Sequence, residues 1–509
     1  MAFKYFPVAF SYGFSRSKEN GSIYLYTALI FSFFVWSLFK YFYPFGNFIN
    51  GDSFAYIIAA RDNESAGVYP IGYPMFLRLF SVFSRSDFAL VTIQFFLLQA
   101  SLFYLFITVI IFFSLAKWAR NCLFVLLICN PINLYLSNYI SSDSFFLSLS
   151  LIWFTQLIRI IYKPETCLII TNSIVFFVLF VTRYNALFYP IIAIAAMFIS
   201  REFLLKKIIG LAISIVLISA FIYSVSISYE RLCGIRQFSP FSGWQMANNA
   251  LYAYRYVDSI KRKDVPARFM KLDQMVRNYF DSTRDVVKHP VEQLKANTVY
   301  MWDPSSPLSI YADSLTRIDS TAGRIKRWAY VGTLYNDYGR TLIWKYPGMF
   351  LRHFIWPNSV KYYTPPAEFL EQYNGGFKTV NEIARKWFNY KDTKIFTRIG
   401  KYYDLQVISY YPIVVGLLNV LVVVSLVAFL SLRLYRFNSS MNKILILGLL
   451  LWLCNFLFSV LASPIALRFQ LFPVFISILL VVFLLECLVR AAFSEDATQL
   501  PRRSKVIGV

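Results

Sequence analysis

Ten long apolar segments constrain the fold of this chain more than any other feature of its sequence. A helix needs roughly 20 mainly apolar residues to cross a bilayer. Segments of this kind lie at about residues 22–42, 88–115, 121–138, 144–162, 167–182, 185–200, 207–228, 407–432, 443–463 and 468–490. Because a backbone in lipid must satisfy its own hydrogen bonds, each segment is expected to be a helix. The sequence therefore predicts an all-α polytopic membrane protein with about ten transmembrane helices.

The fifth and sixth segments are short and meet at residues 182–185. Read as one kinked helix they exceed 30 residues, which is too long for a single crossing. We therefore expect two crossings here.

The composition agrees with a membrane protein. The chain is 58% hydrophobic and 15% charged, whereas soluble domains are about 45–50% apolar and about 25% charged. The net charge of +23 is explained by Lys and Arg in cytoplasmic loops and at anionic lipid surfaces. Nucleic acid is therefore not expected as a partner, whereas membrane lipids are.

The distribution of basic residues tests the count of ten spans. With ten spans, the basic residues of both termini and of the even-numbered connections fall on one side. These residues are Lys4, Arg16, Lys18, Lys117, Arg120, Arg159, Lys163, Arg201, Lys206, Lys207, Arg433, Arg436, Lys443, Arg490, Arg502, Arg503 and Lys505. The positive-inside rule assigns that side to the cytoplasm, so both termini are predicted to be cytoplasmic.

This topology predicts four parts of the chain. Residues 1–228 form a transmembrane module of about seven spans, whose first exoplasmic loop is 43–87. Residues 229–406 form an exoplasmic domain, residues 407–492 a second module of three spans, and residues 493–509 a cytoplasmic tail.

The 229–406 segment is too long for a loop without structure of its own. It holds 27 Lys and Arg against 16 Asp and Glu. Apolar residues recur at helical spacing in 265–300 and 378–400, so a small, mainly helical insert is expected. Its basic excess suits either an anionic ligand, such as a lipid diphosphate, or contact with anionic headgroups.

Asp52 follows the first span by about ten residues and lies in the predicted exoplasmic loop. Transfer of a sugar to a hydroxyl needs a base near the acceptor oxygen, and a carboxylate serves this role. The alternative is a structural role, because Asp is a preferred helix N-cap.

Arg183 and Arg468 lie at the edges of predicted spans. An arginine at such a place is costly unless paired, and its guanidinium binds phosphate through two hydrogen bonds. Both are candidate ligands of a donor phosphate. The alternative is that each extends to the membrane surface or pairs with a structural carboxylate.

Four further residues are candidates for contact with substrate. Asp143 begins a span and either caps its helix or faces the same cavity as Asp52. Tyr69 and Tyr73 are suited to stacking on a sugar, or they belong to the aromatic belt of the membrane interface. His353 is a candidate substrate contact or a packed interfacial residue.

Five short motifs resemble the GT-C superfamily of membrane glycosyltransferases, which includes protein O-mannosyltransferases and the aminoarabinose transferase of lipid A. The motifs lie at 51–56, 69–74, 142–147, 182–190 and 467–473. The resemblance implies a GT-C-like architecture and a polyprenyl-phosphate-linked sugar as the donor. It also implies that Asp52 is the catalytic base and that Arg183 and Arg468 hold the donor phosphate.

The chain departs from this superfamily at one position. Many members carry two adjacent acids in the first loop, whereas Ser53 follows Asp52 here. The need for a divalent cation therefore stays open, and no other cofactor is expected.

The sequence predicts a glycosyltransferase that acts on a lipid, glycan or protein acceptor in the cell envelope. The low number of cysteines, six, favours a bacterial inner membrane, with the site facing the periplasm. Two alternatives remain: an O-antigen-type polysaccharide polymerase, which would depend on arginines within 229–406, and a non-enzymatic lipid or solute transporter.

Overall fold

The computed structural model describes residues 18–493, except 50, 201, 317–322, 400–404, 437–438 and 463. Within these residues the only β-type pairings are two isolated bridges, Asn47–Tyr139 and Thr379–Lys394, and the regular elements are helices. The predicted all-α class is therefore confirmed. The predicted tail, 493–509, lies outside the described residues except for Phe493, as do the basic residues of the N-terminus before Lys18.

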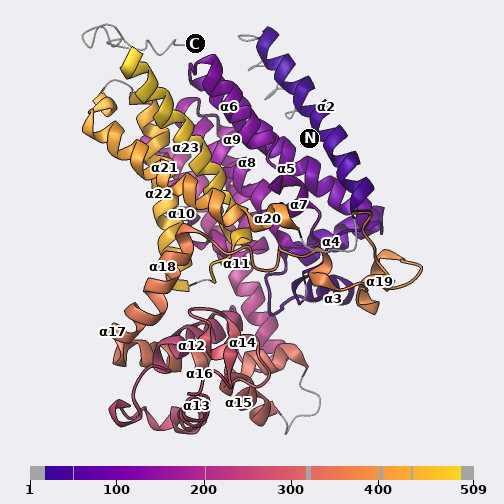
Figure 1. Ribbon diagram of the computed structural model, residues 1–509, viewed down its shortest axis with the longest axis vertical. Coiled ribbons are helices and arrows are strands. Elements are labelled where there is room, and N and C mark those ends of the chain that lie inside the picture. The colour runs from indigo at the N-terminus through magenta and orange to yellow at the C-terminus, as the bar shows by residue number, and fades with distance from the viewer. Residues whose placement is uncertain are drawn as a thin grey trace.

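A bundle of apolar helices forms the larger part of the molecule (Figure 1). It consists of α2 (Lys18–Phe42), α5 (Asp87–Phe112), α6 (Lys117–Ile128), α7 (Ile132–Ser137), α8 (Ser142–Tyr162), α9 (Thr166–Thr182), α10 (Tyr189–Ile199), α11 (Leu204–Cys233), α20 (Gln406–Ser409), α21 (Tyr411–Ser431), α22 (Ser439–Ala462) and α23 (Leu467–Phe493). Eight helical segments of the described chain are long and apolar enough to cross a membrane, and two shorter ones, Thr166–Thr182 and Tyr184–Ile199, lie where the fifth and sixth spans were predicted.

The surface of this bundle is built for lipid. On α2, Ile30 and Phe33 are 71% and 68% exposed, and on α21 Val424 is 60% exposed. Large contiguous apolar surfaces of this kind are rare on soluble proteins and mark contact with a membrane or a partner. The protein is therefore an integral membrane protein.

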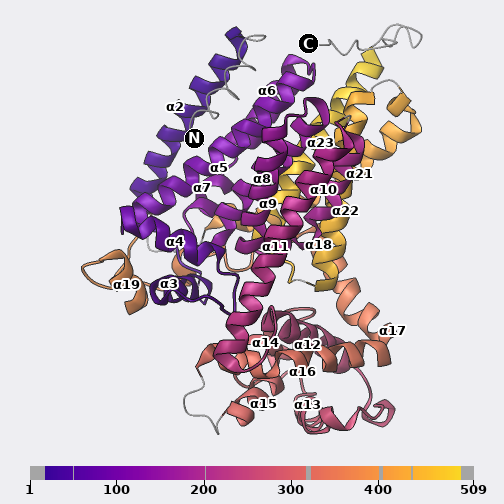
Figure 2. The ribbon, with the colours of Figure 1, turned by 180° about the vertical axis from the view of Figure 1, so that it is seen from behind.

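A smaller helical lobe lies at one end of the bundle (Figures 1 and 2). Its helices are α12 (Pro240–Tyr254), α13 (Met270–Ser282), α14 (Val299–Trp302), α15 (Pro307–Thr316), α16 (Arg324–Lys345) and α17 (Pro347–Phe350). The chain enters the lobe through α11, whose 30 residues span about 45 Å, and returns through α18 (Trp356–Tyr363). The lobe has a core of its own, which includes Trp244, Leu272 and Tyr335.

The 229–406 segment does not pack as one body. Leu370, Ala384 and Ile395 belong to the core of the bundle, not to that of the lobe. This later part carries the short helix α19 (Glu382–Phe388), which lies against α3 (Asp52–Asp62). Within 378–400, where helical spacing was noted, α19 is the only described helix, because Asn389 adopts a left-handed conformation and ends it.

Three helices begin at the end of the bundle that faces the lobe: α3, α8 and α23 (Figures 1 and 2). The turn between α9 and α10 lies at the same end. These four places carry Asp52, Asp143, Arg468 and Arg183, respectively. The fold therefore brings together residues that the sequence separates widely.

Candidate functional site

Asp52 is the first residue of α3, and its carboxylate does not cap the helix. Gly51 occupies the N-cap position with φ of 90°, a conformation that favours glycine, and no side chain caps the helix there. The Ser53 hydroxyl instead turns back and accepts a hydrogen bond of 2.8 Å from the amide of Ile49. This local geometry leaves the Asp52 carboxylate free for a partner elsewhere in the fold.

That partner is Arg468, the second residue of α23. Its Nη1 lies 2.7 Å from Oδ2 of Asp52 and 3.5 Å from Oδ2 of Asp143. The Arg468 side chain is 8% exposed, so it has little contact with bulk water, and its charge is balanced by the two carboxylates. Arg468 therefore links the two carboxylates instead of extending to the membrane surface.

Asp143 also binds the second candidate arginine. Nη1 of Arg183 forms an ion pair with Oδ1 of Asp143, while the Ser141 hydroxyl donates a hydrogen bond of 2.8 Å to Oδ2. The N-cap of α8 is Ser141, whose hydroxyl accepts from the amide of Asp143. As with Asp52, the capping position is taken by another residue.

The result is a chain of alternating charge: Asp52, Arg468, Asp143 and Arg183, which we call the four-charge cluster. The side chains are 17%, 8%, 1% and 14% exposed, respectively. Burial of charge is costly, and a buried ion pair is tolerated only when its partners are well placed. The four charges sum to zero, so each buried charge has a partner of opposite sign.

Arg468 is fixed by aromatic rings and still has an unused donor. Its guanidinium lies 4.5 Å from the ring centre of Phe469 and 5.0 Å from that of Phe369, which is the range of a cation–π contact. Its Nε is buried and has no hydrogen-bond partner among the described residues. A buried, unpartnered donor on a positioned guanidinium is a natural ligand for an oxyanion.

The segment between α18 and α20 carries Phe369 and contacts the start of α23, which carries Phe469. The amide of Leu467 donates a hydrogen bond of 2.8 Å to the carbonyl of Pro366, which joins this loop to the start of α23. Phe369 has φ of 68° and is 55% exposed. A bulky residue with positive φ is a rare and costly conformation, typical of functional sites.

Two tyrosines complete the surroundings of Asp52. The Tyr69 hydroxyl is within hydrogen-bonding reach of its carboxylate. Burial and the charge of Asp52 raise the pKa of Tyr69 well above its usual range, so the hydroxyl remains protonated and donates. Tyr56 lies one turn along α3 and contacts Ser142 at 3.1 Å, and burial, with the nearby Asp52 charge, raises its pKa to about 12.

Tyr69 also meets the lobe. Its ring stacks on that of Trp302, with centres 6.1 Å apart, and Trp302 is 44% exposed. A half-exposed tryptophan beside the cluster is a candidate platform for a sugar ring. Val68, next to Tyr69, belongs to the core of the lobe, so this segment joins the lobe to the surroundings of Asp52.

The other two predicted substrate contacts form no described hydrogen bond or ion pair with the cluster. Tyr73 is fully buried, and its hydroxyl donates a hydrogen bond of 2.7 Å to Gln94. Its ring has no face open to a sugar, so the structure gives it a packing role. His353 lies in the lobe and stacks on Tyr256, 3.9 Å between ring centres, and none of its described contacts is with the four-charge cluster.

Sequence reasoning did not identify Phe369, Trp302 or Glu368. Glu368 lies close enough to Lys361 and Arg468 to interact with both, while burial raises its pKa. All three belong to the 229–406 segment, where the sequence showed an excess of basic residues but no motif. The Pro365-Pro366 pair marks a loop, yet nothing local predicts that this loop returns to residue 468.

The cluster does not fit a divalent cation. Mg²⁺ is commonly held by one or two carboxylates together with waters and substrate phosphates, but here the guanidinium of Arg468 lies between the two carboxylates, where a shared cation would bind. Among the described residues, no group of three or more His, Cys, Asp or Glu is placed to hold a metal. We therefore derive no step through a metal at Asp52.

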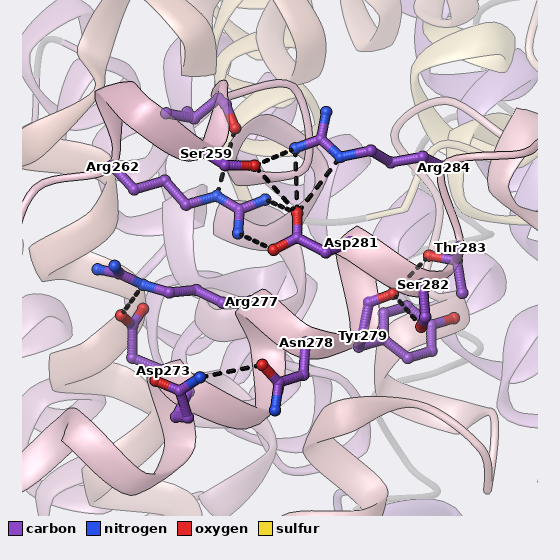
Figure 3. Close-up of polar contacts among 12 residues, drawn as sticks. Ser259, Arg262, Asp273, Arg277, Asn278, Tyr279, Asp281, Ser282, Thr283 and Arg284 are labelled. Carbon is purple, nitrogen blue, oxygen red and sulfur yellow. Dashed lines mark hydrogen bonds and ion pairs between the residues drawn. The ribbon is translucent and has the colours of Figure 1, made fainter.

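The arginines of the lobe are largely engaged in ion pairs. Figure 3 shows Arg262 and Arg284 on Asp281, and Arg277 on Asp273. Deeper in the lobe, Arg255 lies 3.1 Å from Glu292. These pairs explain part of the basic content of the lobe as structural.

Comparison of the chain with protein-family models, with curated proteins and with solved structures gave no significant match.

Proposed function

We propose that this protein is a glycosyltransferase of the GT-C type, which moves a sugar from a polyprenyl-phosphate-linked donor to a lipid, glycan or protein acceptor. One observation carries the proposal. A carboxylate that is suited to act as a base, Asp52, contacts an arginine whose buried Nε has no partner, Arg468. The proposed base and the proposed phosphate-binding arginine are thus in direct contact.

The chemistry follows from these two groups. The donor phosphate would bind the free Nε of Arg468 and compete with Asp52 for the guanidinium. Asp52, released from its partner, would accept the proton of the acceptor hydroxyl. The acceptor oxygen then bonds to the anomeric carbon, the bond from that carbon to the phosphate oxygen breaks, and its electron pair leaves with the polyprenyl phosphate. Arg468 and Arg183 neutralise the charge that develops on this phosphate.

The arrangement of the motifs supports the proposal. Asp52, Asp143, Arg183 and Arg468 come from four of the five segments that resemble GT-C enzymes, and they converge on one cluster. The fifth segment contributes Tyr69 beside Asp52. The resemblance to GT-C enzymes implies that these segments converge at the site of the donor phosphate.

The proposed location is a bacterial inner membrane, with the four-charge cluster facing the periplasm. The cluster and the lobe occupy the end of the bundle opposite to Lys117, which begins α6, and to Arg159, in the last turn of α8. The positive-inside rule assigns the end with these basic connections to the cytoplasm. A donor on the outer leaflet would then meet the site directly.

The test is Asp52→Asn in the purified full-length protein. The assay offers polyprenyl-phosphate sugars labelled in the sugar, a hexose, a pentose and an aminopentose, with an envelope lipid extract as the source of acceptors. Loss of a general base lowers turnover by about 10²–10⁴-fold, and we expect this for Asp52→Asn. Asp62→Asn, at the other end of α3 on an exposed pair with Arg61, is the matched control and should retain activity.

Three results would contradict the proposal. Near-normal transfer by a folded Asp52→Asn protein excludes Asp52 as the base. Loss of activity on substitution of arginines in the lobe, with Asp52→Asn still active, favours a polymerase. Movement of labelled lipid across the bilayer without release of sugar from any of the donors favours a transporter.

A further inference from the structure

A second pocket lies outside the four-charge cluster, where α3, α19 and α4 (Gly72–Phe83) meet at the edge of the bundle. Its volume is about 430 Å³, within the usual range for ligand sites. The lining includes the basic residues Arg61, Arg78, Arg85 and Lys386 and the apolar residues Val82 and Trp387. Four exposed cations thus line one small cavity.

Acidic residues that the structure describes neutralise only one of these four cations. Arg61 is held by Asp62, with distances of 2.6 and 2.8 Å. Arg78 donates a hydrogen bond of 3.2 Å to the carbonyl of Ala60. None of Arg78, Arg85 and Lys386 forms an ion pair with any residue that the structure describes. The pocket therefore carries an excess of positive charge toward its opening.

An apolar face adjoins this charge. On α4, Met75, Leu79, Val82 and Phe83 are 52%, 63%, 76% and 81% exposed, respectively. Their spacing of four, three and one residues places them on one side of the helix. Such a face on an integral membrane protein lies in lipid, so α4 lies at the boundary between acyl chains and headgroups.

The position of these cations is also unusual for the topology. Arg61, Arg78 and Arg85 lie in the loop that the charge distribution predicts to be exoplasmic, where the positive-inside rule disfavours them. Arg61 lies in the last turn of α3 and Asp52 begins it, so the two residues are about 13–14 Å apart along the helix. The cations therefore serve a site distinct from the Asp52 contact.

We propose that the pocket between α3, α4 and α19 binds the phosphate of a membrane-anchored lipid. The phosphate lies among Arg78, Arg85 and Lys386, and the acyl or isoprenoid tail follows the exposed face of α4. Arginine forks and a lysine are the side chains best suited to a phosphate. This inference concerns binding only and does not depend on the proposed activity.

The experiment is native mass spectrometry of the full-length protein with three probes: phosphatidic acid, phosphatidylcholine and inorganic phosphate. We expect phosphatidic acid to bind, phosphatidylcholine to bind more weakly and inorganic phosphate not to compete at equal concentration. Arg78→Gln with Arg85→Gln should weaken phosphatidic acid binding by about tenfold or more.

The matched control removes two arginines elsewhere. Arg268 and Arg340 line a basic pocket of about 410 Å³ on the lobe, so Arg268→Gln with Arg340→Gln changes the net charge equally and should leave binding unchanged. Leu79→Asn with Val82→Asn keeps the cations but removes part of the apolar face, so it should weaken the binding of phosphatidic acid. Equal binding by the Arg78/Arg85 variant and the protein itself, equal losses in the two arginine variants, or competition by free phosphate at equal concentration would each overturn the proposal.

Discussion

At the scale of single residues, Asp143 is the point on which both arginines of the four-charge cluster converge. Asp143→Asn would leave Arg183 without its ion-pair partner inside the protein. Removal of one partner from a buried pair costs about 3–5 kcal/mol, so we expect a marked fall in the thermal unfolding temperature in detergent.

Two further variants control this prediction. Asp285→Asn, in a largely exposed pair with Lys288, should leave the unfolding temperature nearly unchanged. Arg183→Gln added to Asp143→Asn should recover part of the loss, because it removes the unpaired charge. An unfolding temperature of Asp143→Asn equal to that of the unaltered protein would show that the pair is unimportant.

Glu368 predicts a pH dependence of stability. Burial raises its pKa above the value of an unfolded chain. An acid with a raised pKa binds its proton more tightly in the folded state, so its contribution is favourable at low pH and is lost as pH rises through the folded pKa. Glu368→Gln should therefore raise the unfolding temperature at about pH 7.5 relative to that at about pH 5, compared with the unaltered protein.

The control for Glu368 is Glu382→Gln, an exposed residue of α19 that pairs with Arg385. It should leave the pH dependence as it is in the unaltered protein. The same dependence in Glu368→Gln would mean that other groups determine it.

The sequence predicted the four charged members of the cluster, but not what surrounds them. Asp52, Asp143, Arg183 and Arg468 stand out because the predicted topology places all four on the side opposite to the basic connections. Phe369 and Trp302 are ordinary aromatics in a chain with 19% aromatic residues. Tyr73 has the same local pattern as Tyr69, and only the packing distinguishes the buried ring from the one beside Asp52.

At the scale of elements, the apolar segments were predictable and the short helices were not. Length and apolar content alone place a spanning helix, because the bilayer permits few alternatives. The helices of the 229–406 segment depend on tertiary contacts that overrule local preference. In 378–400, for example, the chain folds over the bundle with only seven residues in α19.

The junction of α4 with α9 gives a prediction at this scale. A Cβ on Gly72 would lie 2.7 Å from the carbonyl oxygen of Val181 and from the amide nitrogen of Thr182. Gly72→Ala would therefore force α4 away from the residue that precedes Arg183. We expect a loss of about 1–3 kcal/mol in stability together with reduced activity.

Gly348→Ala is the matched control, since nothing lies within 4 Å of the added Cβ. Thermal unfolding and transfer activity of both variants check the prediction. Normal values for Gly72→Ala would show that this junction adjusts without cost.

At the scale of the whole molecule, the lobe and the bundle have separate cores. The sequence predicted a single insert, because the two parts of 229–406 have similar composition. The apolar residues of the first part pack in the core of the lobe, and those of the second part pack in the core of the bundle. This division depends on the path of the chain through α18. Long-range packing of this kind leaves no local signal.

The predicted topology can be tested with cysteines. In a protein without its six native cysteines, Lys288→Cys in the lobe and Arg436→Cys at the opposite end are labelled with a membrane-impermeant maleimide. Lys288, whose side chain is 79% exposed, should react in intact spheroplasts, whereas Arg436 should react only after permeabilisation. The reverse pattern would place the cluster in the cytoplasm.

The span of the cluster along the chain has a consequence for biogenesis. Asp143 and Arg468 are 325 positions apart, and Arg468 belongs to the last described helix. At a synthesis rate of about 5–20 residues per second, the ribosome completes both carboxylates tens of seconds before their shared arginine exists. Arg183 follows Asp143 by 40 positions and pairs with it early, whereas Asp52 must remain hydrated or protonated at the membrane edge until Arg468 is made. A chain that ends before α23 would lack the guanidinium that pairs with Asp52, so its first exoplasmic carboxylate would stay without its ion-pair partner.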